Sequence, residues 1–209
     1  MAALKKLSQK LLLELGFLFV KEVKGKDNIP AKGGFIVASN HASYIDPLAI
    51  TSAIFKKERK IIRYIGKKEA LENIFFRFLY QIFDVIAIDS SLKRKALNEA
   101  VKTLANDGII GIFPEGARTS DGIIQIQSGK TGVARLAIFS KKPLLPVAIK
   151  NTYILWPVDR RLPKIKRIIR ISIGKPMSVA HYNGRRISKK LLRSITDSIM
   201  ERITELYKD

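Results

Sequence analysis

Two short polar segments contain most of the residues that could do chemistry. The first, from Ser39 to Pro47, contains His41, one of two histidines in the chain, and Asp46 five positions later. An imidazole can take a proton from an alcohol when a carboxylate holds its other ring nitrogen and offsets the charge that the ring gains. Within one helix, five positions would place the two side chains about 140° apart. We therefore expect the pair to form across a helix start.

The spacing of Ser43 and Asp46 is that of a capping box. It predicts Ser43 as the N-cap and Asp46 at the third helical position, with its carboxylate reaching back to the turn that contains His41. The alternative is that Asp46 is itself the N-cap, that Pro47 takes the first helical position and that His41 is an ordinary loop residue. This segment alone does not decide between the two.

The second segment runs from Phe113 to Arg118 and follows an apolar run. Pro114 keeps the residue before it extended, and Gly116 permits a tight bend, so Glu115 and Arg118 can be presented together at a strand end. The planar guanidinium of an arginine suits a phosphate group. The alternative is a surface ion pair between Glu115 and Arg118, which would contribute about 0 to 1 kcal/mol.

The composition excludes several classes of site. The chain has no cysteine, so it has no disulfide framework, no thiolate zinc site and no thiol nucleophile. Two histidines are too few for a metal centre built from several imidazoles. We expect neither a metal nor a bound cofactor.

The chain is strongly basic, with 39 Lys and Arg against 18 Asp and Glu and a formal net charge of +21. From Lys150 to Arg193 there are 13 basic residues and a single acid, Asp159. Such a region favours anionic lipid surfaces and phosphate-bearing or acidic partners. Nucleic-acid binding is the rival interpretation. We do not expect it, because the basic residues alternate mainly with Ile, Leu and Val and no known binding motif is present.

Helical and strand-like stretches alternate along the chain, which predicts an α/β fold with a central mixed β-sheet flanked by helices. The predicted strands are Phe35 to Ala38, Ile61 to Ile65, Val85 to Ile88, Ile109 to Phe113, Leu144 to Ile149 and Arg167 to Ile173. The predicted helices are Leu48 to Lys57, Lys68 to Gln81, Leu92 to Ala105, Thr131 to Phe139 and Ser188 to Tyr207, with Ser188 as a candidate cap.

A leucine row at helical spacing predicts an amphipathic N-terminal helix that contacts a membrane. Its members are Leu4, Leu7, Leu11, Leu15 and Leu18. The most apolar run, Leu11 to Val20, is half the length of a membrane span and contains Glu14. No small-residue cleavage site follows it. We expect residues 1–30 to form this helix and a linker, residues 31–209 to form one domain, and the protein to bind peripherally at the cytoplasmic face of the cell membrane.

Together the two polar segments resemble a known family. NHASYID at 40–46 and FPEGART at 113–119 resemble the paired signatures of the glycerolipid acyltransferases, whose type members are 1-acyl-sn-glycerol-3-phosphate acyltransferases. Residues 66–89, between the two segments, resemble the second block of that family, and residues 129–132 and 145–148 resemble its later blocks. The resemblance covers about residues 34–150.

The resemblance implies acyl transfer from a thioester, acyl-CoA or acyl-ACP, to the sn-2 hydroxyl of 1-acyl-sn-glycerol-3-phosphate, which yields phosphatidic acid. It implies His41 as the general base, oriented by Asp46. It places Glu115, Gly116 and Arg118 on the glycerol phosphate of the acceptor. Further phosphate contacts from lysines are expected, although each of these could equally be a solvated surface lysine: Lys67, Lys68 and Lys130. Another lysolipid or glycerol 3-phosphate is the alternative acceptor, and acyl carrier protein is a candidate partner.

The sequence departs from the family pattern at three positions. Ala117 replaces the usual Thr or Gly, and Thr119 replaces Ser. Ser90 stands where the family commonly has an arginine. Lys93 or Arg94, a few residues later, could supply that charge.

Overall fold

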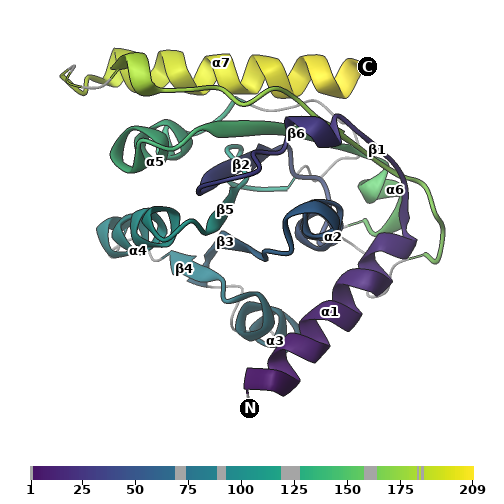
Figure 1. Cartoon of the computed structure of the whole chain (residues 1–209). Helices are drawn as coiled ribbons and strands as arrows, with labels where there is room; N and C mark the ends of the chain where they lie inside the picture. The colour runs from purple at the N-terminus through teal and green to yellow at the C-terminus, as the bar shows by residue number, and fades with distance from the viewer. Residues whose placement is uncertain are drawn as a thin grey trace.

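The computed structural model describes residues 2–68, 74–88, 93–118, 128–157, 164–182, 184 and 186–209, with the backbone alone at 2, 3 and 74–76. Its centre is a seven-stranded sheet in the order β1-β7-β6-β2-β5-β3-β4 (Figure 1). Strands β6, β2, β5, β3 and β4 are parallel to one another. Strand β7 pairs antiparallel with β6, and β1 pairs parallel with β7, so the sheet is mixed as predicted.

The described strands are β1 (Val20–Lys24), β2 (Phe35–Ser39), β3 (Ile62–Lys67), β4 (Ile86–Ile88), β5 (Ile109–Ile112), β6 (Leu144–Lys150) and β7 (Ile169–Ile173). The described helices are α1 (Ala2–Leu18), α2 (Asp46–Glu58), α3 (Ile74–Phe83), α4 (Lys93–Ala105), α5 (Gly132–Ser140), α6 (Thr152–Leu155) and α7 (Lys189–Lys208). Short 3-10 turns lie at Lys26–Asn28 and Ala180–Tyr182.

All six predicted strands are present, with ends that differ by one or two residues. Strand β1 and helix α6 were not predicted from the sequence. Strand β1 lies within the segment 1–30 that the sequence analysis assigns to a helix and linker, and that division of the chain stays a prediction. Ser188 caps α7, because its hydroxyl oxygen accepts the backbone N–H of Leu191 at 3.1 Å.

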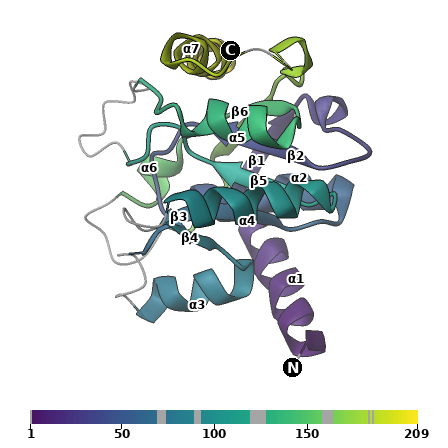
Figure 2. The same ribbon diagram turned by 90° about the vertical axis from the view of Figure 1, so that its left-hand side faces the viewer.

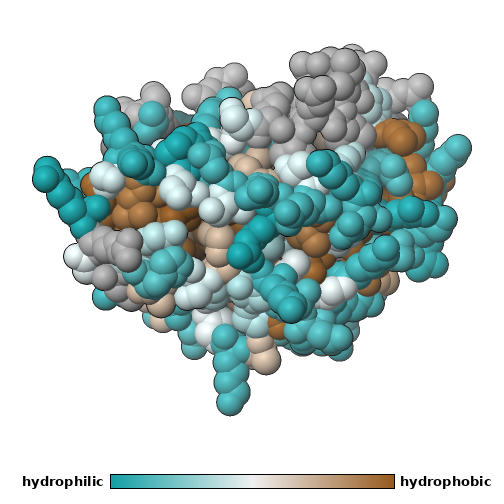
Figure 3. Space-filling view, turned by 90° about the horizontal axis from the view of Figure 1, so that it is seen from above, coloured by the Kyte–Doolittle hydropathy of each residue, from teal (hydrophilic) through white to brown (hydrophobic). Residues whose placement is uncertain are grey.

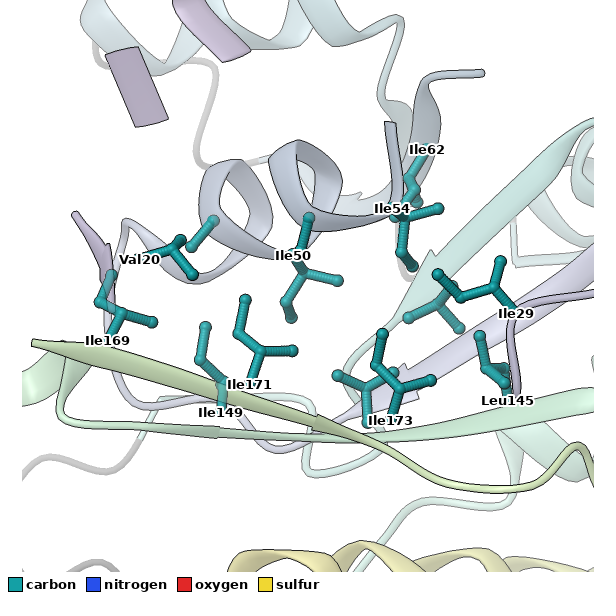
Figure 4. Packing of buried hydrophobic residues seen from close by; sticks show 14 of the residues in the cluster. Val20, Ile29, Ile50, Ile54, Ile62, Leu145, Ile149, Ile169, Ile171 and Ile173 are labelled. Carbon is teal, nitrogen blue, oxygen red and sulfur yellow. The ribbon is translucent and has the colours of Figure 1, made fainter. Parts of the chain in front are cut away.

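The two faces of the sheet carry separate cores. One face packs against α2, where Ile50 and Ile54 meet β-branched and leucine side chains of β2, β6 and β7 (Figure 4). The other face packs against α4, α5 and α7 (Figures 1 and 2). Strand β2 shows the alternation, because Phe35 and Val37 belong to the first core and Ile36 to the second. Strand β2 is therefore buried on both faces, which fixes the position of the residues that follow it.

Helix α1 packs on α2 and α3 through the face that carries Leu13 and Gly16, so the leucine row lies on the other side of the helix. The row is exposed, by 72% at Leu4, 61% at Leu11 and 65% at Leu18. Within the described part of the chain, no helix combines the length and apolarity that a bilayer crossing needs.

Candidate active site

The two polar segments meet at the carboxyl edge of the parallel strands. One follows β2 and the other follows β5, and these strands are hydrogen-bonded neighbours that run in the same direction. In open α/β sheets this edge is where ligands bind. The backbone N–H of His41 donates to Oε1 of Glu115 at 2.9 Å, which ties the two segments together.

His41 and Asp46 are paired. Nδ1 of His41 lies 2.8 Å from Oδ2 of Asp46, which is fully buried, while the side chain of His41 is 18% exposed. Helix α2 begins at Asp46, so the contact forms across a helix start, as the spacing predicts. Because Nδ1 contacts the carboxylate, any proton transfer with a substrate falls to Nε2.

The detailed capping predictions were wrong in register. The N-cap of α2 is Ile45. Asp46 therefore occupies the first helical position, and neither the N-cap nor the third position. The carboxylate of Asp46 nevertheless reaches back, because Oδ2 accepts the backbone N–H of Ala42 and of Ser43, each at 2.8 Å. The hydroxyl of Ser43 instead donates to the backbone oxygen of Trp156 at 2.6 Å, which ties the loop to the end of α6. Pro47 at the second position is tolerated, because the first turn of a helix has no partner for its backbone N–H.

The Phe113 to Arg118 segment forms the predicted turn. Gly116 has φ +72° and its N–H donates to the carbonyl oxygen of Phe113 at 3.0 Å. The positive φ is what favours glycine here, and Nζ of Lys130 lies over the position that a Cβ would take. The structure thus brings Lys130 to the turn, where its backbone N–H donates to the carbonyl oxygen of Pro114 at 2.7 Å.

Glu115 is buried, 4% exposed, and its carboxylate holds the backbone of His41. The structure therefore gives this residue a contact within the protein that the sequence did not indicate. Its contact with an acceptor molecule stays a prediction.

Arg118 lies half-buried beside the same loop. Its guanidinium carbon is 3.5 Å from the ring centroid of Tyr44, a cation–π geometry. Nη1 of Arg118 is buried and has no hydrogen-bond partner among the described residues. An unpaired buried donor costs about 1 to 3 kcal/mol, and more when it is charged. An anionic ligand at this edge would supply the missing partner.

The remaining predicted phosphate contacts are spread along the same edge. Lys67 ends β3, the neighbour of β5, and Lys68 follows it; both are exposed, as is Lys130. Ser90 and Thr119 lie outside the described residues. Lys93 and Arg94 are exposed in the first turn of α4.

The described residues contain no cluster of three or more metal-ligating side chains. The arrangement at this edge is a buried carboxylate, an imidazole and a half-buried guanidinium. Such a set suits proton transfer beside a phosphate-bearing substrate.

Two residues that build the site were not predicted from the sequence. Asn40, 2% exposed, links β2 to β6, because its side chain donates to the carbonyl oxygen of Ile149 and accepts the N–H of Ile149, each at 2.9 Å. The sequence did contain a signal for Asn40, because an amide side chain directly follows an apolar strand. The second is Tyr64 on β3, whose ring stacks on Phe113. No local sequence pattern indicates that Tyr64 belongs to the site.

Residues 21–150 match the family model described as Acyltransferase, and this match covers both polar segments. The chain belongs to the acyltransferase family. It is 27% identical over 186 residues to the 1-acyl-sn-glycerol-3-phosphate acyltransferase of Bacillus subtilis, covering 88% of this chain and 87% of that one. It is 30% identical over 133 residues to the enzyme of that name from Borreliella burgdorferi, covering 62% of this chain and 51% of that one.

The fold is that of a solved member of the acyltransferase family. The crystal structure of the 1-acyl-sn-glycerophosphate acyltransferase PlsC from Thermotoga maritima superposes with a TM-score of 0.69 at 26% identity, over 97% of this chain and 80% of that one. This acyltransferase therefore places its His41 and Arg118 segments on a sheet shared with a lysophosphatidic acid acyltransferase.

Proposed function

We propose that this acyltransferase moves a fatty acyl group from an acyl thioester to the sn-2 hydroxyl of 1-acyl-sn-glycerol-3-phosphate, making phosphatidic acid. The observation that carries the proposal is the 2.8 Å contact between His41 and Asp46, at the edge where Arg118 has a buried donor without a partner among the described residues. The names of the relatives above support the choice of acceptor.

The chemistry needs one proton transfer in each direction. Nε2 of neutral His41 takes the proton of the acceptor hydroxyl while its oxygen bonds to the thioester carbonyl carbon. Asp46 holds Nδ1 and offsets the charge on the imidazolium. The tetrahedral intermediate then breaks its C–S bond, and the departing thiolate receives the proton from His41. No acyl-enzyme is required, because the acceptor alcohol is itself the nucleophile.

Arg118 is the residue best placed for the acceptor's phosphate. A charge-assisted hydrogen bond from its buried Nη1 would satisfy that donor and orient the glycerol backbone. Lys130, packed over Gly116, adds a second cation beside the same turn. Lys67 and Lys68 would extend the positive edge toward β3, where the phosphates of coenzyme A or the acidic surface of an acyl carrier protein could bind.

The substrate is a lipid, so we further propose that the protein lies peripherally on the cytoplasmic face of the cell membrane and contacts it through α1. The exposed leucine row of α1 would enter the acyl boundary, and basic residues would contact anionic headgroups. The face that α7 covers is different, because Figure 3 shows mainly hydrophilic side chains there with apolar residues in separate patches.

The test is a substitution of each histidine. A general base contributes about 10² to 10⁴ in rate, so His41→Ala should lose most turnover while the protein still folds. His181→Ala is the matched control, because His181 is the only other histidine, is exposed and lies in a 3-10 turn. It should keep full turnover.

The assay offers acyl-CoA and acyl-ACP with a panel of lysolipids and glycerol 3-phosphate, and follows free thiol and product mass. Thioester loss with only lysophosphatidic acid as acceptor supports the proposal. Full activity in purified His41→Ala, or a wild-type protein that leaves every thioester intact, would overturn it.

A further inference from the structure

Behind the imidazole of His41 stands a stack of two aromatic rings. The rings of His41 and Phe113 have centroids 4.0 Å apart and planes 13° apart. Phe113 in turn stacks on Tyr64, with centroids 5.4 Å apart and planes 8° apart. The three residues come from β2, β5 and β3 or their carboxyl ends, and these strands are consecutive in the sheet. We call Phe113 and Tyr64 the ring stack.

The inner ring of the stack has little freedom. Tyr64 is 5% exposed, and its register partner on β5 is Gly111. A side chain at Gly111 would collide with Cδ1 and Cε1 of the Tyr64 ring, so the glycine makes the room that this ring fills. Because the Tyr64 ring is buried between the sheet and a helix, it is a rigid support for Phe113.

Tyr64 is also bound to the helix that carries Asp46. Its hydroxyl donates to the carbonyl oxygen of Pro47 at 3.2 Å, and Oγ1 of Thr51 lies 3.4 Å from the Tyr64 hydroxyl oxygen. Burial, together with the charge of Asp46, raises the pKa of the Tyr64 phenol and keeps it a neutral donor. Tyr64 is therefore linked indirectly to both members of the pair: to His41 through Phe113, and to Asp46 through Pro47, the next residue of α2.

We propose that Phe113 and Tyr64 are positioning residues for His41. The contact with Asp46 fixes one ring nitrogen, and the flat face of Phe113 sets the tilt of the imidazole about that contact. Nε2 is then held at a fixed orientation to the acceptor hydroxyl. The inference rests on the proposed function, in which Nε2 takes the hydroxyl proton.

The first experiment separates orientation from substrate binding. Phe113→Leu and Phe113→Met keep an apolar side chain of similar bulk but no flat ring, and the unbranched Met also covers the case in which Leu does not fold. Since misplacement by about 1 Å can cost 10²-fold in rate, we expect kcat to fall about 10- to 100-fold. The KM values of donor and acceptor should stay unchanged. Phe113→Tyr restores the ring and should restore kcat.

The second readout needs no substrate. The chain has two histidines, so ¹H–¹³C spectra of histidine-labelled protein contain two sets of ring signals, and His41→Ala assigns them. The Phe113 ring, 4.0 Å away, shifts the His41 protons by its ring current. We expect this shift to disappear in Phe113→Leu and to remain in Phe113→Tyr.

A matched control exists at the other histidine. His181 contacts the ring of Tyr182 with centroids 3.8 Å apart. Tyr182→Leu should move only the His181 signals and leave kcat unchanged. Two results beside an active wild type would contradict the inference: Phe113→Leu and Phe113→Met keep the wild-type kcat, or they leave the His41 signals unshifted. Either result would overturn the inference about the ring stack and leave the proposed function standing. A wild type without acyl transfer overturns the proposed function instead.

Discussion

At the scale of single residues, Asp46 shows how a buried carboxylate is kept at the sheet edge. One of its oxygens, Oδ2, receives three contacts, from Nδ1 of His41 and from the backbone N–H groups of Ala42 and Ser43. Asp46 also sits in the first turn of α2, where the helix dipole favours negative charge. The groups that stabilise the buried charge are therefore the groups that orient the imidazole.

The guanidinium of Arg118 packs on the ring of Tyr44, with its carbon 3.5 Å from the ring centroid. A cation–π contact contributes about 0.5 to 2 kcal/mol, which corresponds to about 2- to 30-fold in affinity. Tyr44→Leu should raise the acceptor KM by that factor, because the phosphate contact loses its support. The measurement is a titration of lysophosphatidic acid at saturating donor.

Two controls accompany the Tyr44 prediction. Tyr44→Phe keeps the ring face, so its acceptor KM should match the wild type, and the donor KM should stay constant in both variants. An acceptor KM that rises equally in Tyr44→Phe and Tyr44→Leu would show that the hydroxyl, and not the ring face, is the feature that matters.

At the scale of elements, the site depends on how strands β2, β5 and β6 are joined beyond their regular ladders. Asn40 continues β2 by one residue and takes both backbone groups of Ile149 with its side chain. This contact closes the gap between β2 and β6 at the point where the chain turns toward His41. The position of the imidazole therefore depends on an amide that does no chemistry.

Asn40→Ala should destabilise the protein strongly, because it leaves the N–H and C=O of the buried Ile149 without partners. Two such groups cost about 2 to 6 kcal/mol, measured as a lower free energy of unfolding in urea. The matched control is Asn28→Ala, which removes one hydrogen bond from a partly buried side chain to Ile173. It should cost about 1 kcal/mol, and an equal loss in the two variants would contradict this account.

The elements also show what the sequence could predict. Runs such as residues 35–38 and 109–113 were identifiable as strands because their apolar pattern is local, and the polar residues after them marked the edge. Strand β1, with the charged sequence VKEVK, was not identifiable, since its structure comes from pairing with β7. The contact of Glu115 with His41 and the fit of Tyr64 over Gly111 depend on strand order and register. Local patterns do not encode either.

At the scale of the whole molecule, α1 has one packed face and one exposed face. Its inner face packs against α2 and α3, while the leucine row on its outer face is exposed at every position from Leu4 to Leu18. Figures 1 and 2 show α1 at the lower margin of the molecule, away from α7. A row of exposed leucines on one helix is the kind of apolar surface that marks a protein–protein or a membrane interaction site, and the membrane is the partner proposed above.

The leucine row can be tested with a pair of matched double variants. Leu7→Ser with Leu11→Ser removes two exposed side chains, 64% and 61% accessible, without touching the packed face of α1. Burying two leucines in a bilayer contributes about 3 kcal/mol or more, so the partition coefficient for anionic vesicles should fall about 100-fold. The measurement is co-sedimentation with vesicles that contain phosphatidylglycerol.

The control changes the same number of exposed apolar residues elsewhere. Phe139→Ser with Ile187→Ser alters positions 49% and 39% exposed, on α5 and just before α7, elements that lie away from α1 in Figure 1. It should bind vesicles as the wild type does. Both double variants should also keep the wild-type rate on a water-soluble, short-chain lysolipid, because neither touches the sheet edge. Equal vesicle binding by the two variants would show that the membrane contacts the protein through another surface, and that the leucines of α1 face outward for a different reason.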